Sequence, residues 1–121
     1  MVLIIDDDPR NVLALKATLA VRNYKVLTAL SAKEGIQLMK DNKDVAVVLL
    51  DMMMPDMDGY EALSIIRADK ELEKLAVVAV TAQAMVGDKE KCLEAGADAY
   101  LKKPVDVDEL LELIDRLKKQ Q

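Results

Sequence analysis

The stretch from Leu49 to Gly59 reads LLDMMMPDMDG and decides the fold assignment. Its first two residues complete a continuous apolar run that starts at Val45. The run stops at the carboxylate of Asp51, and a loop containing Pro55 and Gly59 follows at once. An apolar run without alternation is typical of a strand covered on both faces. An ionised Asp at the end of such a strand costs free energy unless another group compensates it. The stretch therefore places Asp51 at the mouth of a sheet.

The rest of the chain alternates between apolar runs and helical segments. We predict strands at residues 2–5, 24–30, 45–50, 75–80 and 99–102, and helices at residues 9–21, 31–40, 59–68, 86–95 and 106–118. Asp8 is a candidate helix cap, the residues after Ser31 and Asp106 have capping-box spacing, and Gly96 fits a C-terminal cap. This alternation predicts an α/β fold, a doubly wound parallel sheet with helices on both faces.

Five polar residues follow the ends of four predicted strands. Asp6 and Asp7 end the first strand, Asp51 the third, Thr81 the fourth and Lys103 the fifth. Ligands of such folds bind beyond the carboxyl ends of the strands. We therefore expect these side chains to meet in one crevice, and a cis bond before Pro104 would direct Lys103 into it.

Three consecutive carboxylates, Asp6, Asp7 and Asp8, repel one another, and a bound divalent cation relieves that repulsion. Oxygen ligands at an open site suit Mg²⁺, which readily shares a phosphoryl oxygen. Asp8 taken alone is equally well explained as a helix cap. The methionines at 52–54 are interpreted as core and rim residues, because thioethers are poor ligands for a hard cation.

Composition narrows the possible functions. A chain of 121 residues that is 52% hydrophobic is long enough for one packed domain and is not generally disordered. The net charge of −5 argues against nucleic-acid binding, and the absence of His excludes a phosphohistidine within the chain. The single Cys92 fits a reducing compartment, and no apolar run is long enough to cross a membrane. With no signal-peptide pattern, we predict a cytoplasmic domain without membrane contact.

In their order and spacing, these motifs resemble the response regulator receiver domain of two-component signalling. The motifs are Asp6-Asp7, Asp51 with the following MPDMDG loop, Thr81-Ala82 and Lys103-Pro104, and the resemblance covers essentially the whole chain. It implies a flavodoxin-like fold with strand order 2-1-3-4-5, and residues 1–121 as one receiver domain. It also implies that the partner is a histidine kinase or a histidine phosphotransfer domain, whose phosphohistidine supplies a phosphoryl group to Asp51.

The resemblance further implies a metal site and a nucleophile. Asp51 would attack phosphorus as a carboxylate. Asp7 and Asp51 would ligate Mg²⁺ directly, Asp6 through water, and the backbone carbonyl of Met53 would complete the protein ligands.

The remaining roles implied by the resemblance concern the switch. Lys103 would pair with Asp51 and, after transfer, with a phosphoryl oxygen. Thr81 would donate its hydroxyl to another phosphoryl oxygen, and Tyr100 is the expected switch aromatic. The fourth helix, fifth strand and fifth helix would form the readout surface. The domain would catalyse its own phosphorylation and slow hydrolysis, while acting mainly as a signalling switch.

Two further features extend the resemblance. Met53 and Gln83 occupy positions that tune the phosphoryl lifetime in the family, and a Met there predicts slow self-dephosphorylation because it cannot orient water. The first helix is apolar on more than one face. Either it packs tightly on the sheet, or exposed positions such as Val12 and Leu13 form a docking surface for a helical phosphodonor.

Alternatives remain open at this stage. Asp6-x-Asp8 with Thr81 and Lys103 would also suit a haloacid-dehalogenase-type phosphatase that uses Asp6, although that reading leaves Asp51 unexplained. A receiver fold that acts as a docking module without phosphorylation is the other alternative. The segment 81–97 resembles receivers of hybrid histidine kinases, so the domain is expected to be either a stand-alone receiver or part of such a kinase.

Overall fold

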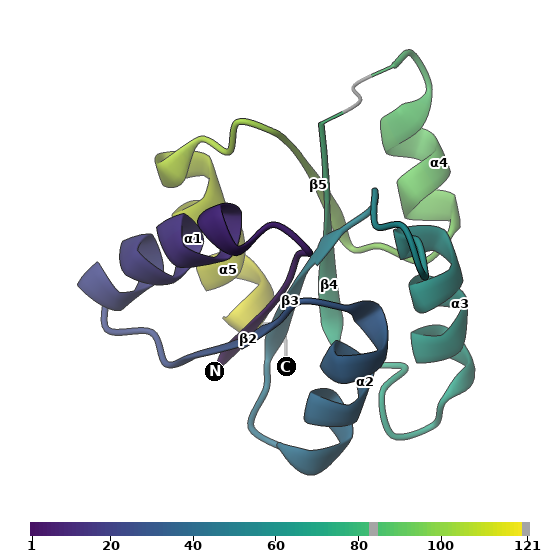
Figure 1. Ribbon diagram of the computed structural model, residues 1–121, viewed down its shortest axis with the longest axis horizontal. Helices are drawn as coiled ribbons and strands as arrows, with labels where there is room; N and C mark the ends of the chain where they lie inside the picture. Colours follow the sequence, from purple (N-terminus) through teal and green to yellow (C-terminus); the bar gives the residue numbers. More distant parts are fainter. Residues whose placement is uncertain (83–84, 120–121) are drawn as a thin grey trace.

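Five strands and five helices alternate in the part of the chain that the computed structural model describes, residues 1–82 and 85–119 (Figure 1). The strands are β1 (Val2–Ile5), β2 (Val26–Ala29), β3 (Val47–Asp51), β4 (Ala76–Thr81) and β5 (Ala99–Lys102). The helices are α1 (Pro9–Val21), α2 (Ala32–Asp41), α3 (Gly59–Ala68), α4 (Asp88–Glu94) and α5 (Val107–Lys119). The predicted alternation is confirmed.

All strand pairs are parallel, and the sheet has the order β2-β1-β3-β4-β5. This order confirms the flavodoxin-like, doubly wound fold. The order reverses at β1 and β3, and in such sheets ligands bind beyond the carboxyl ends of the strands near that reversal.

The helices cover both faces of the sheet. In Figure 1, α1 and α5 lie on one side, and α2, α3 and α4 lie on the other. Alternate residues of β1 therefore enter different cores: Leu3 belongs to the core that includes Leu63 of α3, whereas Ile4 belongs to the core that includes Leu19 of α1. None of the helices in the described part of the chain is long and apolar enough to cross a membrane.

Strand boundaries differ from the prediction at the functional edge. β3 includes Asp51 and β4 includes Thr81, because the ladder pairs Asp51 with Val80 and Thr81 with Lys102. The edge strand β2 is shorter than the predicted 24–30, since it pairs only with the four residues of β1. Asp51 and Thr81 therefore belong to hydrogen-bonded strands and not to the loops that follow them.

Side chains cap several helices as the sequence predicts. The carboxylates of Asp8 and Asp106 accept backbone N–H groups of the first turns at 2.9 and 3.0 Å. The Ser31 hydroxyl accepts the N–H of Glu34 at 3.2 Å. These bonds satisfy donors that a helix start leaves without partners, so each helix begins at a defined residue.

The helix predicted at 86–95 begins later than expected, at Asp88. Gly87 has φ of 86°, a left-handed conformation that does not continue into an α-helix. At the other end the prediction is confirmed. Gly96 has φ of 118°, and the N–H groups of Gly96 and Ala97 each donate at 3.1 Å to carbonyls of the last turn.

The expectation that Val12 is exposed on α1 is wrong. Val12 is buried in the core beneath α1, because it lies on the helix stripe that faces the sheet together with Leu19. Leu13, the next residue around the helix, is 69% exposed, as expected.

Gly59, the first residue of α3, sits against the chain immediately after Asp51. A Cβ at this position would lie 2.2 Å from Met52 Sδ and 2.7 Å from Met52 Cα. The thioether could rotate away, but the Met52 backbone is held by its bond to the Val80 carbonyl at 3.0 Å. A side chain at position 59 therefore forces α3 away from β3.

We expect Gly59→Ala to lower the free energy of unfolding by about 1 to 3 kcal/mol through this overlap. Denaturant titration measures the change. Ser64→Ala, an exposed position on the same helix, serves as a matched control and should stay within about 0.5 kcal/mol of the wild type. Equal stability of Gly59→Ala and the control would contradict the close packing of α3 on Met52.

Candidate functional site

Asp51 is the last residue of β3 and is only 4% exposed. One carboxylate oxygen accepts the backbone N–H of Met53 at 3.0 Å. That bond turns the loop after β3 back over the strand end and fixes the orientation of the carboxylate. The other oxygen, Oδ2, faces Lys103 at 3.7 Å.

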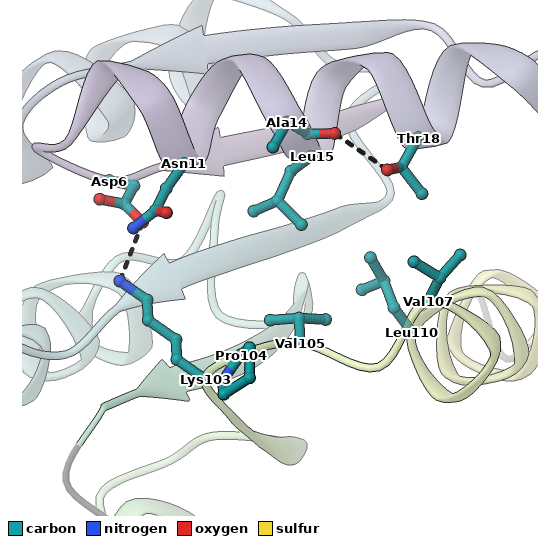
Figure 2. A pocket seen from close by; sticks show the side chains of 10 residues that line it. All are labelled: Asp6, Asn11, Ala14, Leu15, Thr18, Lys103, Pro104, Val105, Val107 and Leu110. Atoms are coloured by element: carbon teal, nitrogen blue, oxygen red, sulfur yellow. Dashed lines mark hydrogen bonds and ion pairs between the residues drawn. The ribbon is translucent and has the colours of Figure 1, made fainter.

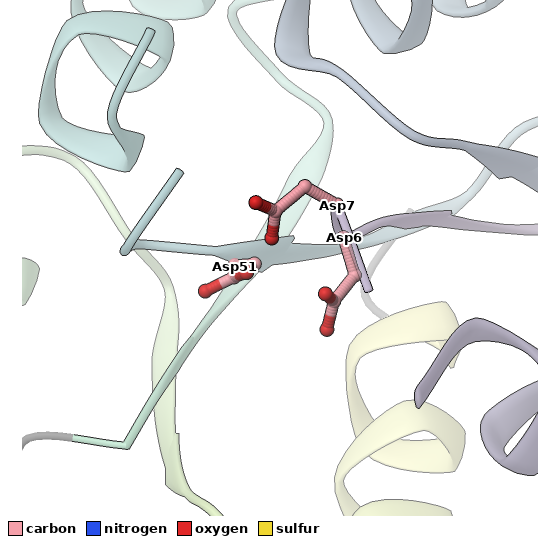
Figure 3. A group of neighbouring side chains, drawn as sticks. All are labelled: Asp6, Asp7 and Asp51. Atoms are coloured by element: carbon pink, nitrogen blue, oxygen red, sulfur yellow. The ribbon is translucent and has the colours of Figure 1, made fainter. Parts of the chain in front are cut away.

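Asp6 and Asp7 follow β1 and bring two more carboxylates to Asp51. Asp6 is buried and accepts the backbone N–H of Asp8 at 2.9 Å, whereas Asp7 is exposed. One oxygen from each of Asp6, Asp7 and Asp51 lies within 4.8 Å of the others. Figure 3 shows the three side chains near one another, with Asp7 beside Asp51 and the Asp6 carboxylate directed to the other side in this view.

This donor set fits a hard divalent cation. All three groups offer carboxylate oxygens, and one of them is open to solvent, which leaves room for water and a ligand oxygen. The neighbouring thioethers of Met52 and Met54 are buried in the core, as predicted, while Met53 is exposed at the rim.

Lys103 places an ammonium group against the acidic cluster. The Lys103–Pro104 peptide is cis, and the side chain runs back toward the strand ends. Its Nζ lies 3.1 Å from Asp6 Oδ2 and 3.7 Å from Asp51 Oδ2, so Asp6 is the nearer partner. The sequence resemblance implied a pair with Asp51, and the structure shows Lys103 shared between Asp51 and Asp6.

The pKa of Asp51 is raised from 3.8 to about 6. Burial is the largest cause, and the charges of Asp6 and Asp7 act in the same direction. The Met53 N–H and the Lys103 ammonium oppose the shift. The carboxylate is thus compensated only in part, and it still ionises below neutral pH.

Thr81 and Tyr100 lie on the neighbouring strands. Thr81 ends β4 and is buried, and its backbone carbonyl accepts the N–H of Lys103 at 2.8 Å. Tyr100 lies on β5, and its hydroxyl donates to Asp88 of α4 at 3.1 Å. The two strands connect the pocket to α4.

The structure gathers the predicted site residues at one sheet edge. Asp6, Asp7 and Asp51 each bring one oxygen within 4.8 Å of the others there, and Lys103 pairs with Asp6 and Asp51. Thr81 ends the adjacent strand, and Met53 follows Asp51. Gln83 lies outside the described residues. Sequence reasoning missed Tyr60 and Asp88: the Tyr60 hydroxyl donates to Asp88, which also accepts from Tyr100, and no motif connects residues so far apart in the chain.

Residues 2–115 match the sequence profile of the response regulator receiver domain. The chain belongs to the response regulator receiver family. Among relatives of this receiver domain, the polar-differentiation response regulator DivK of Brucella ovis is 30% identical over 113 residues, covering 93% of this chain and 91% of the relative.

Solved receiver structures have the same fold. The receiver domain of a Francisella response regulator is 31% identical, with a TM-score of 0.89 over 98% of this chain and 96% of that one. The receiver domain of a Pseudomonas aeruginosa sensor histidine kinase is 30% identical, with a TM-score of 0.88 and the same coverage. That protein is described with a magnesium ion coordinated in its active site cleft. Receivers of response regulators and of kinases are thus both similar to this chain.

We expect Asp51→Asn to stabilise the protein in metal-free buffer at neutral pH by about 1 to 3 kcal/mol, given about 1.4 kcal/mol per pKa unit. Because the folded-state pKa of Asp51 is about 6 and the unfolded value is 3.8, the folded state binds more protons between these values. The stability contributed by Asp51 therefore falls as pH rises through this window.

Urea unfolding with chelator at several pH values measures the effect. The advantage of Asp51→Asn should shrink as pH falls and disappear below pH 3.8, where the wild-type carboxyl is protonated in both states. Asp56→Asn removes an exposed carboxylate from the same loop and should change little at any pH. A neutral-pH effect of Asp51→Asn no larger than this control would show that Asp51 is fully compensated.

Proposed function

We propose that residues 1–121 act as one phosphoacceptor unit in which Asp51 takes a phosphoryl group from a phosphohistidine of a partner kinase or phosphotransfer domain. One observation carries the proposal. The buried Asp51 carboxylate shares a crevice with two further carboxylates and one ammonium group, at the edge where the sheet meets solvent. Family membership supports it, since receiver domains work with histidine kinases.

Asp51 is suited to nucleophilic attack. At neutral pH it is mostly ionised, because its pKa is about 6. An Asp51 oxygen would form a bond to phosphorus while the bond from phosphorus to the donor imidazole nitrogen breaks. The electron pair of that bond leaves with the imidazole, which takes a proton from solvent. The product is an acyl phosphate on Asp51.

The other pocket residues would compensate charge during this step. Lys103, now 3.1 Å from Asp6 and 3.7 Å from Asp51, can move its ammonium to a phosphoryl oxygen without leaving the crevice. Thr81 would donate its hydroxyl to a second phosphoryl oxygen. Such contacts lower the barrier because phosphoryl transfer depends mainly on alignment and charge stabilisation.

Asp6, Asp7, Asp51 and the backbone carbonyl of Met53 would hold Mg²⁺. The ion, when bound, neutralises negative charge on the phosphoryl group and the carboxylates. Two observations support this assignment. One oxygen from each of Asp6, Asp7 and Asp51 lies within 4.8 Å of the others, and the similar Pseudomonas aeruginosa receiver is described with magnesium in its cleft.

Phosphorylation would then shift a conformational equilibrium. Contacts of Thr81 and Lys103 with the phosphoryl group favour a different arrangement of β4, β5 and the loops after them. Tyr100 would change orientation with this rearrangement, and the surface formed by α4, β5 and α5 would report it.

The phosphodonor would approach over α1. A cavity of about 270 Å³ lies between α1 and the segment after β5, and Figure 2 shows that Asp6 and Lys103 stand at one end of it. Its remaining lining is largely apolar, with Leu15 on one side and Val105 and Leu110 on the other. Leu13 is also exposed on α1, outside the lining of this cavity. We assign α1 and this cavity to a helical, histidine-bearing donor.

We expect one phosphoryl adduct by intact mass after incubation with acetyl phosphate and Mg²⁺. The adduct should be absent in Asp51→Asn and in wild type treated with chelator. Asp56→Asn, an exposed carboxylate of the same loop, should retain it. An adduct that persists in Asp51→Asn would instead point to a phosphatase-like nucleophile such as Asp6. A wild type that takes no adduct from either acetyl phosphate or a phosphorylated kinase would support a docking module.

We expect Leu13→Ala to slow transfer from a phosphorylated histidine kinase that phosphorylates the wild type. A loss of about fivefold in kcat/KM corresponds to one truncated apolar contact at an interface. Phosphorylation by acetyl phosphate, which needs no docking surface, should be unchanged. Val21→Ala, at an apolar position that is 79% exposed at the far end of α1, is the matched control. Equal kinetics for Leu13→Ala and Val21→Ala would remove Leu13 from the docking surface.

A further inference from the structure

Asp88, the first residue of α4, binds two tyrosines that belong to different elements. Tyr60 of α3 donates its hydroxyl to Asp88 Oδ1 at 3.2 Å. Tyr100 of β5 donates to Asp88 Oδ2 at 3.1 Å. One carboxylate thus joins α3, α4 and β5, and each of its oxygens is used by one phenol.

Cys92, one turn further along α4, extends these contacts. The Cys92 sulfur lies 3.6 Å from the Tyr60 hydroxyl. Because the single hydroxyl proton of Tyr60 is directed to Asp88, the thiol is the donor to the Tyr60 oxygen. The resulting chain runs from Cys92 through Tyr60 and Asp88 to Tyr100, and we call these four residues the tyrosine clamp.

The clamp is built on packed side chains. Cys92 is fully buried, and both rings pack on the core that lies beneath α2, α3 and α4. The Lys91 ammonium lies 4.7 Å from the centre of the Tyr60 ring and covers its outer side. Burial raises the pKa of Tyr100 to about 12 and also raises the pKa of Tyr60, so both phenols remain donors at neutral pH.

The clamp is connected to the phosphoacceptor pocket by short paths. Tyr100 lies three residues before Lys103, and α4 begins seven residues after Thr81. β4 and β5 are paired side by side, with Thr81 opposite Lys102. A turn of the Tyr100 ring must therefore either carry Asp88 along or break a bond of the clamp.

We propose that the tyrosine clamp stabilises the arrangement in which Lys103 is paired with Asp6 and Asp51, and so opposes the phosphorylated arrangement. This inference rests on the proposed function. Tyr60 and Asp88 are then positioning residues for the switch, acting through Tyr100 and α4. Because coupling between two sites is reciprocal, weakening the clamp must strengthen the binding of a phosphoryl analogue at Asp51.

Beryllofluoride, a mimic of the aspartyl phosphoryl group, tests this coupling by titration in the presence of Mg²⁺. The chain has three tyrosines and neither Trp nor Phe. NMR of protein with isotope-labelled tyrosine rings therefore shows three ring environments, each assignable from one Tyr→Phe variant. We expect Tyr60→Phe and Asp88→Asn to lower the midpoint for beryllofluoride about fivefold, the effect of one net hydrogen bond.

Two matched controls separate the clamp from general effects. Tyr24→Phe removes a phenol that also donates to a carboxylate, that of Asp115 on α5, away from the clamp. Glu90→Gln removes a negative charge from the same first turn of α4 as Asp88. Both should keep the wild-type midpoint. In Asp88→Asn the Tyr60 and Tyr100 resonances should shift while the Tyr24 resonance stays in place.

The outcomes distinguish the two proposals. A wild type that binds no beryllofluoride and takes no phosphoryl group would overturn the proposed function and the clamp with it. A wild type that responds, with the same midpoint or a higher one in Tyr60→Phe, would overturn the clamp alone. If Asp88→Asn fails to fold, Tyr60→Phe decides the result, since it keeps the ring and removes only the hydroxyl.

Discussion

The structure depends on one electrostatic constraint, the placement of a nearly buried carboxylate beside two others. Asp51 ends the central strand, where burial and the charges of Asp6 and Asp7 all disfavour its ionised form. Within the described residues, Lys103 is the cation that pairs with this cluster. It comes from the far end of the chain, so the compensation exists only when β5 is docked beside β4. Formation of the sheet and compensation of the pocket are therefore one event.

The incomplete compensation of the Asp51 charge is what would suit this site to the proposed phosphoryl transfer. A fully paired Asp51 would be a poor nucleophile and would gain little from a cation or a phosphoryl group. The pKa of Asp51 is raised, and the Lys103 ammonium is shared between Asp51 and Asp6. A ligand that adds charge to the pocket or disperses it therefore changes the electrostatic free energy of all these groups. The tyrosine clamp lies beyond this pocket, where Asp88 of α4 accepts hydrogen bonds from Tyr100 of β5 and Tyr60 of α3. In the proposed function, phosphoryl transfer and the conformational response are connected through the adjacent strands β4 and β5.

Local sequence patterns determined most of the elements and the identity of the pocket residues. Helix starts at Pro9 and Ala32 follow from capping side chains that act within three or four residues, and Gly96 ends α4 through its own backbone conformation. Parallel strands must present their carboxyl ends at one edge, so Asp6, Asp51 and Lys103 could be assigned to one crevice before any coordinates. Such inferences succeed because the forces involved are local or follow from topology.

Tertiary structure alone decided how these groups are partnered. The pairing of Lys103 with Asp6 as well as Asp51, the burial of Val12 beside an exposed Leu13, and the bonds of Asp88 to two tyrosines all depend on distances of a few ångströms between elements. Residue spacing cannot supply those distances, because the rotation of each helix and the register of each strand are set by packing across the sheet. The amino-acid sequence specifies which chemical groups lie at the strand ends, whereas packing between the elements sets which of these groups touch.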